Sequence, residues 1–127
     1  MRIAIDTDRY VDFARGEEEA VAQVRRASRL YVPFVVLAEL RAGFLCGSRA
    51  SRNEAILTRF LNGSRVEVLY PDEETAHHHA RLFRDLRARG TPIPTNDLWT
   101  GALAVQHGLH LFARDSHFDN LPQIPRV

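Results

Sequence analysis

Short apolar runs alternate along the chain with longer stretches in which apolar residues recur at helical spacing. The short runs predict buried strands at residues 2–6 (RIAID), 30–32 (LYV), 66–69 (VEVL) and 110–113 (HLFA), with a last short strand at 126–127. The longer stretches predict helices over 8–15, 17–27, 33–46, 48–61, 71–89 and 98–107. Strands that alternate with helices throughout predict an α/β sandwich around a parallel sheet of four to five strands.

Turn and cap residues mark the borders of these elements. Thr7 or Asp8 is available to cap the first predicted helix. Residues 91–97 (TPIPTND) predict a loop, because two prolines disfavour a helix across them.

Length and composition indicate an ordinary globular protein. The 127 residues predict a single domain over 1–127, and 45% hydrophobic with 26% charged residues is typical of such domains. No apolar run approaches the roughly 18 residues of a membrane span, and no signal peptide is expected, because an acid already stands at position 6. The lone Cys46 is expected to be a small buried hydrophobe. A single cysteine fits a reducing compartment, so we expect a cytoplasmic protein.

All 17 basic residues are arginine, and the chain contains no lysine. This excludes chemistry that needs a lysine amine, such as a Schiff base or a Walker-type phosphate ligand. Arginine remains suited to phosphate, because its planar guanidinium group binds two oxygens at once.

Four carboxylates fall where a parallel sheet would bring them together. Asp6 ends the first predicted strand, Asp115 follows the fourth, Asp97 lies at the mouth of a helix, and Glu39 lies inside an apolar helix. Each aspartate alone could be a turn or cap residue, whereas a glutamate among apolar residues is rare unless it is paired. Carboxylates gathered at one edge repel one another unless a cation joins them, and Mg²⁺ or Mn²⁺ suits oxygen ligands.

Four segments carry a resemblance to a known family: "IDT", "VVLAELRAGF", "GTPIPTNDLWTGALAVQHGL" and "LFARDSHFDNLP". Through them, essentially the whole chain resembles the PIN-domain ribonucleases and, within that group, the VapC-type toxins of toxin–antitoxin pairs. The resemblance implies an α/β/α sandwich and metal-dependent endonucleolytic cleavage of RNA in the presence of Mg²⁺, which Mn²⁺ can replace.

The resemblance also implies roles for individual residues. Asp6, Glu39, Asp97 and Asp115 would form the catalytic cluster, with the three aspartates as metal ligands and Glu39 orienting or deprotonating a water molecule. The chain departs from the family pattern at Asp8, where Ser or Asn is common, and at Ala113, where a hydroxyl is common. Further candidates beside the metal or the substrate are Thr7, Asp8, Asn96, Asp119, Arg9, Arg41 and Arg114, the three arginines for the RNA backbone.

The partners that the resemblance implies are an RNA substrate and an antitoxin protein that blocks the acidic cleft. A homodimer is also expected, because family members commonly form one.

Other interpretations explain parts of the sequence. A catalytically inactive PIN-type module that binds RNA or protein is the non-enzymatic alternative. The "DTD" opening also resembles haloacid-dehalogenase-type phosphatases, but these ordinarily need a lysine. Three consecutive histidines, His77–His79, cannot converge on one ion from a helix. His117, close to Asp115, is interpreted as a structural histidine rather than a substrate contact.

Overall fold

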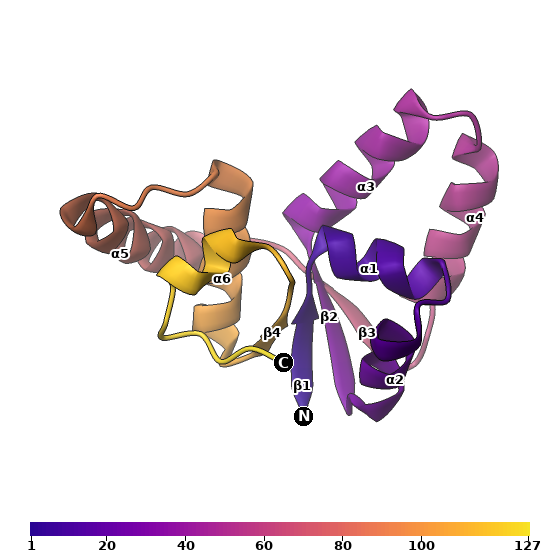
Figure 1. Ribbon diagram of the computed structural model, residues 1–127, viewed down its shortest axis with the longest axis horizontal. Helices are drawn as coiled ribbons and strands as arrows, with labels where there is room; N and C mark the ends of the chain where they lie inside the picture. The colour runs from indigo at the N-terminus through magenta and orange to yellow at the C-terminus, as the bar shows by residue number, and fades with distance from the viewer.

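A computed structural model describes all 127 residues as a parallel sheet with helices on both faces (Figure 1). The strands are β1 (Arg2–Ile5), β2 (Arg29–Pro33), β3 (Val66–Leu69) and β4 (His110–Phe112), in the order β3-β2-β1-β4. Every neighbouring pair is parallel. The predicted fold class is confirmed with four strands. The expected fifth strand is reduced to one bridge between Leu111 and Arg126.

Side chains of the central strand point alternately to the two faces of the sheet. Ile3 and Ile5 join the core on one face, and Ala4 joins the core on the other. This alternation follows from the period of two in an extended strand. Because both faces are covered, the strands are apolar on both sides, as is typical of parallel sheets.

Six α-helices cover the sheet. The core that contains Ile3 and Ile5 lies under α1 (Thr7–Ala14), α2 (Glu18–Arg26), α3 (Phe34–Cys46) and α4 (Ala50–Leu61). The opposite core lies under α5 (Glu73–Arg89) and α6 (Thr95–His107). In Figure 1 the hairpin of α3 and α4 extends beyond the end of the sheet at which β1 leads into α1. None of these helices combines the length and apolar character needed to cross a membrane.

Three local predictions are wrong. The last long helix begins at Thr95 rather than at 98, because the prolines restrict only the residues up to Pro94, whose carbonyl oxygen already accepts the N–H of Leu98 at 3.0 Å. The N-cap of α1 is Asp6, and its side chain makes no capping hydrogen bond. Cys46 is exposed, because it lies in the last turn of α3, in the protruding hairpin.

Candidate active site at the carboxyl edge of the sheet

Asp6 lies where β1 ends, and its surroundings disfavour its charge. It is 5% exposed, and no arginine or histidine forms an ion pair with it. Burial raises the pKa of its carboxyl to about 7, partly offset by the backbone N–H of Thr7, and the charges of Asp97, Glu39 and Asp8 raise it further. A buried carboxyl with a raised pKa and no positive partner is a candidate ligand for a cation.

Asp97 lies in the first turn of α6 and connects two groups of polar side chains. Its side chain is 14% exposed. Burial raises its pKa, the hydrogen bond to His117 lowers it, and the charges of Asp115 and Glu39 raise it again. Asp97 therefore contacts His117 and lies near Asp115, and it is close enough to Asp6 and Glu39 for their charges to interact.

Asp115 precedes a short 3₁₀ helix, η1 (Ser116–Asn120), and accepts the backbone N–H of His117 at 2.9 Å. The Nδ1 atom of His117 lies 2.8 Å from Oδ2 of Asp97 and 2.9 Å from Oδ1 of Asp115. Ligand atoms of these three residues lie within 4.8 Å of one another. His117, which the sequence led us to interpret as a structural histidine, therefore lies among the candidate ligands.

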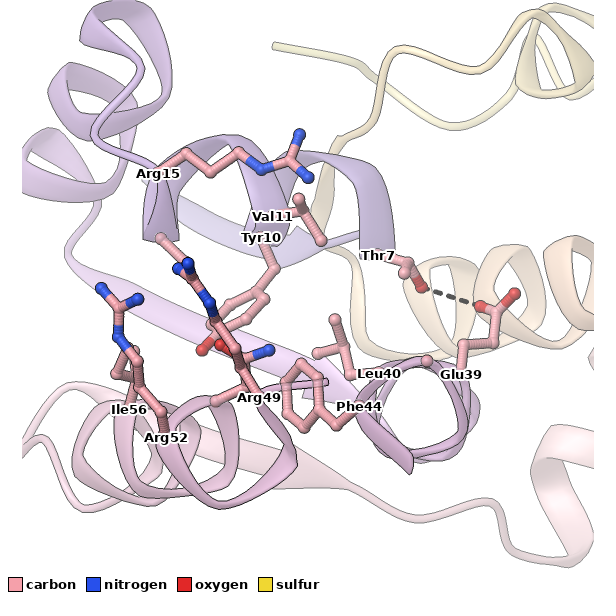
Figure 2. Close-up of a pocket in the computed structure, with 13 residues that line it drawn as sticks. Thr7, Tyr10, Val11, Arg15, Glu39, Leu40, Phe44, Arg49, Arg52 and Ile56 are labelled. Atoms are coloured by element: carbon pink, nitrogen blue, oxygen red, sulfur yellow. Dashed lines mark hydrogen bonds between the residues drawn. The ribbon is translucent and has the colours of Figure 1, made fainter. Parts of the chain in front are cut away.

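Glu39 faces the same edge from α3 and is held by a neighbouring hydroxyl. The Oγ1 atom of Thr7, the first residue of α1, donates a hydrogen bond of 2.8 Å to Oε1 of Glu39 (Figure 2). This bond joins the start of α1 to α3 and fixes one carboxylate oxygen, while Oε2 of Glu39 accepts no protein hydrogen bond.

Three of the remaining acidic and amide candidates lie at the margin of this group. Asp8 is exposed in the first turn of α1 and acts on the site through its charge, which raises the pKa of Asp6. Asn96 is exposed at the start of α6. Asp119 is 69% exposed, pairs with Arg126 at 2.5 Å and is not part of the group formed by Asp97, Asp115 and His117.

The three arginines predicted for RNA are bound to carboxylates of the chain itself. Arg9 is enclosed by Asp12, Glu17 and Glu19 and lies over the ring of Phe112, with the guanidinium carbon 4.8 Å from the ring centroid. Its 14% exposed side chain argues against a phosphate contact. The other two pairs are Arg41 with Glu54 and Arg114 with Asp12, each at 2.9 Å.

Arg126, near the end of the chain, holds the segment that carries Asp115. Its Nη2 atom donates to the carbonyl oxygen of Ala113 at 2.7 Å and to that of Asp115 at 3.3 Å. Nη1 pairs with Asp119 in the same segment. The sequence held no signal for this contact, because it depends on the last residues returning beside β4.

The donor atoms of this edge fit a hard divalent cation. Mg²⁺ and Mn²⁺ prefer carboxylate oxygens, and the structure gathers those of Asp97 and Asp115 around the imidazole of His117. Asp6 is not part of this tight group, but the charge of Asp97 reaches it and raises its pKa. The consecutive histidines take no part in this group, and His79 instead lies against Trp99, with ring centroids 4.1 Å apart.

Comparisons with known proteins indicate the family of the chain. The family model of the PIN domain matches residues 3–124. Ribonuclease VapC4 of Mycobacterium tuberculosis is 33% identical over 93 residues, which cover 73% of this chain and 72% of that protein.

Solved structures share the fold. DNA-bound VapBC from Salmonella typhimurium has a TM-score of 0.87 at 25% identity and covers 100% of this chain and 97% of that one. VapBC-5 from Mycobacterium tuberculosis, a member of the VapBC family of toxin–antitoxin systems, has a TM-score of 0.74 at 27% identity, covering 99% and 98%. The chain belongs to the PIN domain family and, within that family, to the VapC ribonucleases.

Proposed function

We propose that the chain is an endoribonuclease that depends on a divalent cation and acts as the toxin of a toxin–antitoxin pair. The observation that carries the proposal is the buried carboxyl of Asp6, which has no positive partner and lies beside Asp97 and Glu39. The names of its relatives support the reaction, since VapC4 is a ribonuclease. We further propose that residues 1–127 act as one domain, because both cores share one sheet.

The metal ligands in this proposal are Asp6, Asp97 and Asp115, with His117 as a neighbour that contacts two of them. A divalent cation, Mg²⁺ or Mn²⁺, would supply charge neutralisation at the phosphate and a lowered pKa for water. The three carboxylates approach from β1, the start of α6 and the segment after β4, so the fold fixes their positions before any ion binds.

Glu39 is the proposed base. Its Oε1 atom is held by Thr7, which leaves Oε2 to orient a water molecule and to accept its proton as the water attacks phosphorus. The water oxygen forms a new bond to phosphorus on the side opposite the leaving oxygen, and the bond between phosphorus and that leaving oxygen breaks. The leaving oxygen takes a proton from solvent and becomes a hydroxyl group, and no side chain forms a covalent bond with the substrate.

The test of the reaction is cleavage of a mixture of tRNA and ribosomal RNA by the purified chain. We expect internal cuts with Mg²⁺ or Mn²⁺, no cuts in excess EDTA, and recovery when Mn²⁺ is returned. Equal cleavage in EDTA would contradict the proposal.

The inactive-module alternative predicts RNA or protein binding without cuts under any of these conditions. The phosphatase alternative predicts hydrolysis of a generic phosphomonoester instead, which the same preparation would reveal.

The proposed partner is an antitoxin encoded beside this chain, supported by structural relatives that are VapBC assemblies. Expression of the chain alone should stop growth, and co-expression of the adjacent reading frame should restore it. Growth arrest that the adjacent frame does not relieve would contradict the toxin role while leaving the nuclease intact.

We also propose a homodimer, supported by the exposed aromatic pair Phe34 and Tyr70, with ring centroids 5.7 Å apart. Light scattering after size exclusion tests it, and a monomer at micromolar concentration would contradict it.

A further inference from the structure

A pocket of about 650 Å³ opens beside the acidic edge, between α1, α3 and the start of α4 (Figure 2). Thr7 and Glu39 line one end of it, so the pocket begins where the proposed catalytic group ends. Its volume lies within the range of about 300–1,000 Å³ that is usual for ligand sites.

Three arginines line this pocket: Arg15 from the end of α1, Arg49 immediately before α4 and Arg52 in its first turn (Figure 2). None of the three guanidinium groups forms an ion pair with a carboxylate. The carboxylates nearest in sequence are already engaged: Glu17 and Asp12 by Arg9, Asp12 also by Arg114, and Glu54 by Arg41. The lining thus holds three unpaired guanidinium groups and one carboxylate, Glu39 at the end beside the acidic edge, and its net charge is positive.

Apolar side chains form the rest of the lining. Val11, Leu40, Phe44 and Ile56 contribute aliphatic and aromatic surface between the arginines. The helix α4 also begins without a side-chain cap, so its first backbone N–H groups add to the positive potential at this end. Cations around an apolar surface suit a ligand that alternates anionic groups with flat apolar ones.

An endonuclease must hold its substrate on both sides of the bond it cuts. An RNA strand that continued past Glu39 would enter this pocket, because Thr7 and Glu39 belong both to the acidic edge and to the pocket lining. We propose that the pocket is a subsite for single-stranded RNA, in which Arg15, Arg49 and Arg52 bind phosphates that flank the scissile one and the apolar surface receives a base. This inference rests on the proposed ribonuclease function and adds where the substrate lies.

The occupant is RNA rather than an acidic peptide because phosphates and bases alternate along one strand. Base stacking on apolar and aromatic side chains accompanies phosphate contacts in single-strand binding sites. A peptide of acidic residues alone would satisfy the arginines but leave the apolar surface uncovered.

The test measures the binding of a fluorescein-labelled 15-nucleotide single-stranded RNA of mixed sequence by fluorescence anisotropy. The buffer contains EDTA so that no cleavage occurs. The variant Arg15→Ala/Arg49→Ala/Arg52→Ala is expected to bind at least tenfold more weakly than the unaltered chain. The slope of the logarithm of the binding constant against the logarithm of the salt concentration should be shallower by about 2 for this variant. Each phosphate contact to a single strand contributes about 0.7 to that slope, and the variant loses three arginines. Circular dichroism and thermal melting check that the variants are folded.

A matched control removes the same charge elsewhere. Arg25, Arg26 and Arg81 are exposed, unpaired and outside the pocket, so their triple alanine variant should bind RNA within twofold of the unaltered chain. A second variant, Gly43→Leu, fills the pocket without changing charge. A Cβ at Gly43 meets no atom within 4 Å, so the substitution introduces no clash at that atom, and thermal melting checks that the variant is folded. Its RNA binding should fall at least fivefold with an unchanged salt slope.

Three results would overturn the inference. One is equal binding by the pocket variant and its control. Another is a decaglutamate peptide that binds more tightly than the RNA and depends on the same arginines. The third is an unaltered chain that cuts no RNA with Mn²⁺, which overturns the ribonuclease function as well. If the unaltered chain cuts RNA with Mn²⁺ but the pocket variant and the control variant bind RNA equally, the subsite is overturned and the ribonuclease function stands.

Discussion

The buried carboxyl of Asp6 makes a quantitative prediction about the metal-free protein. Burial raises its pKa from the ordinary 3.8 to about 7. At about 1.4 kcal/mol per pH unit, this difference corresponds to about 4 kcal/mol of free energy when the carboxyl is ionised in the folded chain. The substitution Asp6→Asn keeps the shape of the side chain and removes the charge, and therefore removes this cost.

The sign of the effect follows from proton binding. Below pH 3.8 the carboxyl is protonated in both the folded and the unfolded chain, and the variant and the unaltered protein should be about equally stable. Between pH 3.8 and about 7 the folded chain binds more protons than the unfolded chain, so the free energy of unfolding falls as the pH rises. At pH 8, Asp6→Asn should therefore be more stable than the unaltered chain by about 2–4 kcal/mol.

Urea denaturation in EDTA at pH 4 and pH 8 measures this difference. The control Asp119→Asn changes an exposed surface pair and should shift the free energy of unfolding by no more than about 1 kcal/mol at either pH. Adding Mn²⁺ at pH 8 should stabilise the unaltered chain and narrow its gap to Asp6→Asn. If Asp6→Asn were no more stable than the unaltered chain at pH 8 in EDTA, the carboxyl would be ionised without cost and the reasoning would fail.

Three further substitutions separate the roles around the site. Glu39→Gln should lower kcat for RNA cleavage at least about 100-fold by removing the base, with Mn²⁺ affinity by calorimetry nearly unchanged; a loss of affinity instead would make it a metal ligand. His117→Ala should weaken Mn²⁺ binding about 10-fold, since groups that contact metal ligands commonly contribute this much, and unchanged affinity would refute its part in the site. Arg126→Ala should lower the free energy of unfolding by about 1–3 kcal/mol and speed amide hydrogen exchange in residues 113–119. Exchange as slow as in the unaltered chain would show that Arg126 does not hold that segment.

The sequence predicted the parts of the fold that depend on local patterns. The bounds predicted for the strand at 66–69 are those of the structure, because a short run rich in β-branched residues between turn residues favours a strand over a helix. The predicted start of the helix that carries Asp97 lies three residues after its observed start at Thr95. The sequence pattern did not show that the carbonyl oxygen of Pro94 accepts the first helical hydrogen bond. A single backbone contact thus decides whether Asp97 lies in a loop or in a helix.

The candidate site was predictable only in its carboxylates. Asp6 and Glu39 stand out because acids are rare in apolar surroundings, and the order of the strands brings their segments to one edge. The contacts of His117 and Arg126 depend on how η1 and the last residues fold back over β4, which no local pattern encodes. For the same reason, the sequence does not predict that Arg15, Arg49 and Arg52 lack ion-pair partners. Whether they find partners depends on which carboxylates the other arginines engage.

Metal-dependent cleavage of RNA through the acidic edge is tested most directly by comparing Asp97→Asn with Asp119→Asn. Both substitutions remove one negative charge, but only Asp97 lies close to Asp6, Glu39, Asp115 and His117. With Mn²⁺ and the RNA mixture, Asp97→Asn is expected to produce no fragments while remaining folded, and Asp119→Asn is expected to cut like the unaltered chain. Fragments from Asp97→Asn at the rate of the unaltered chain would contradict the account.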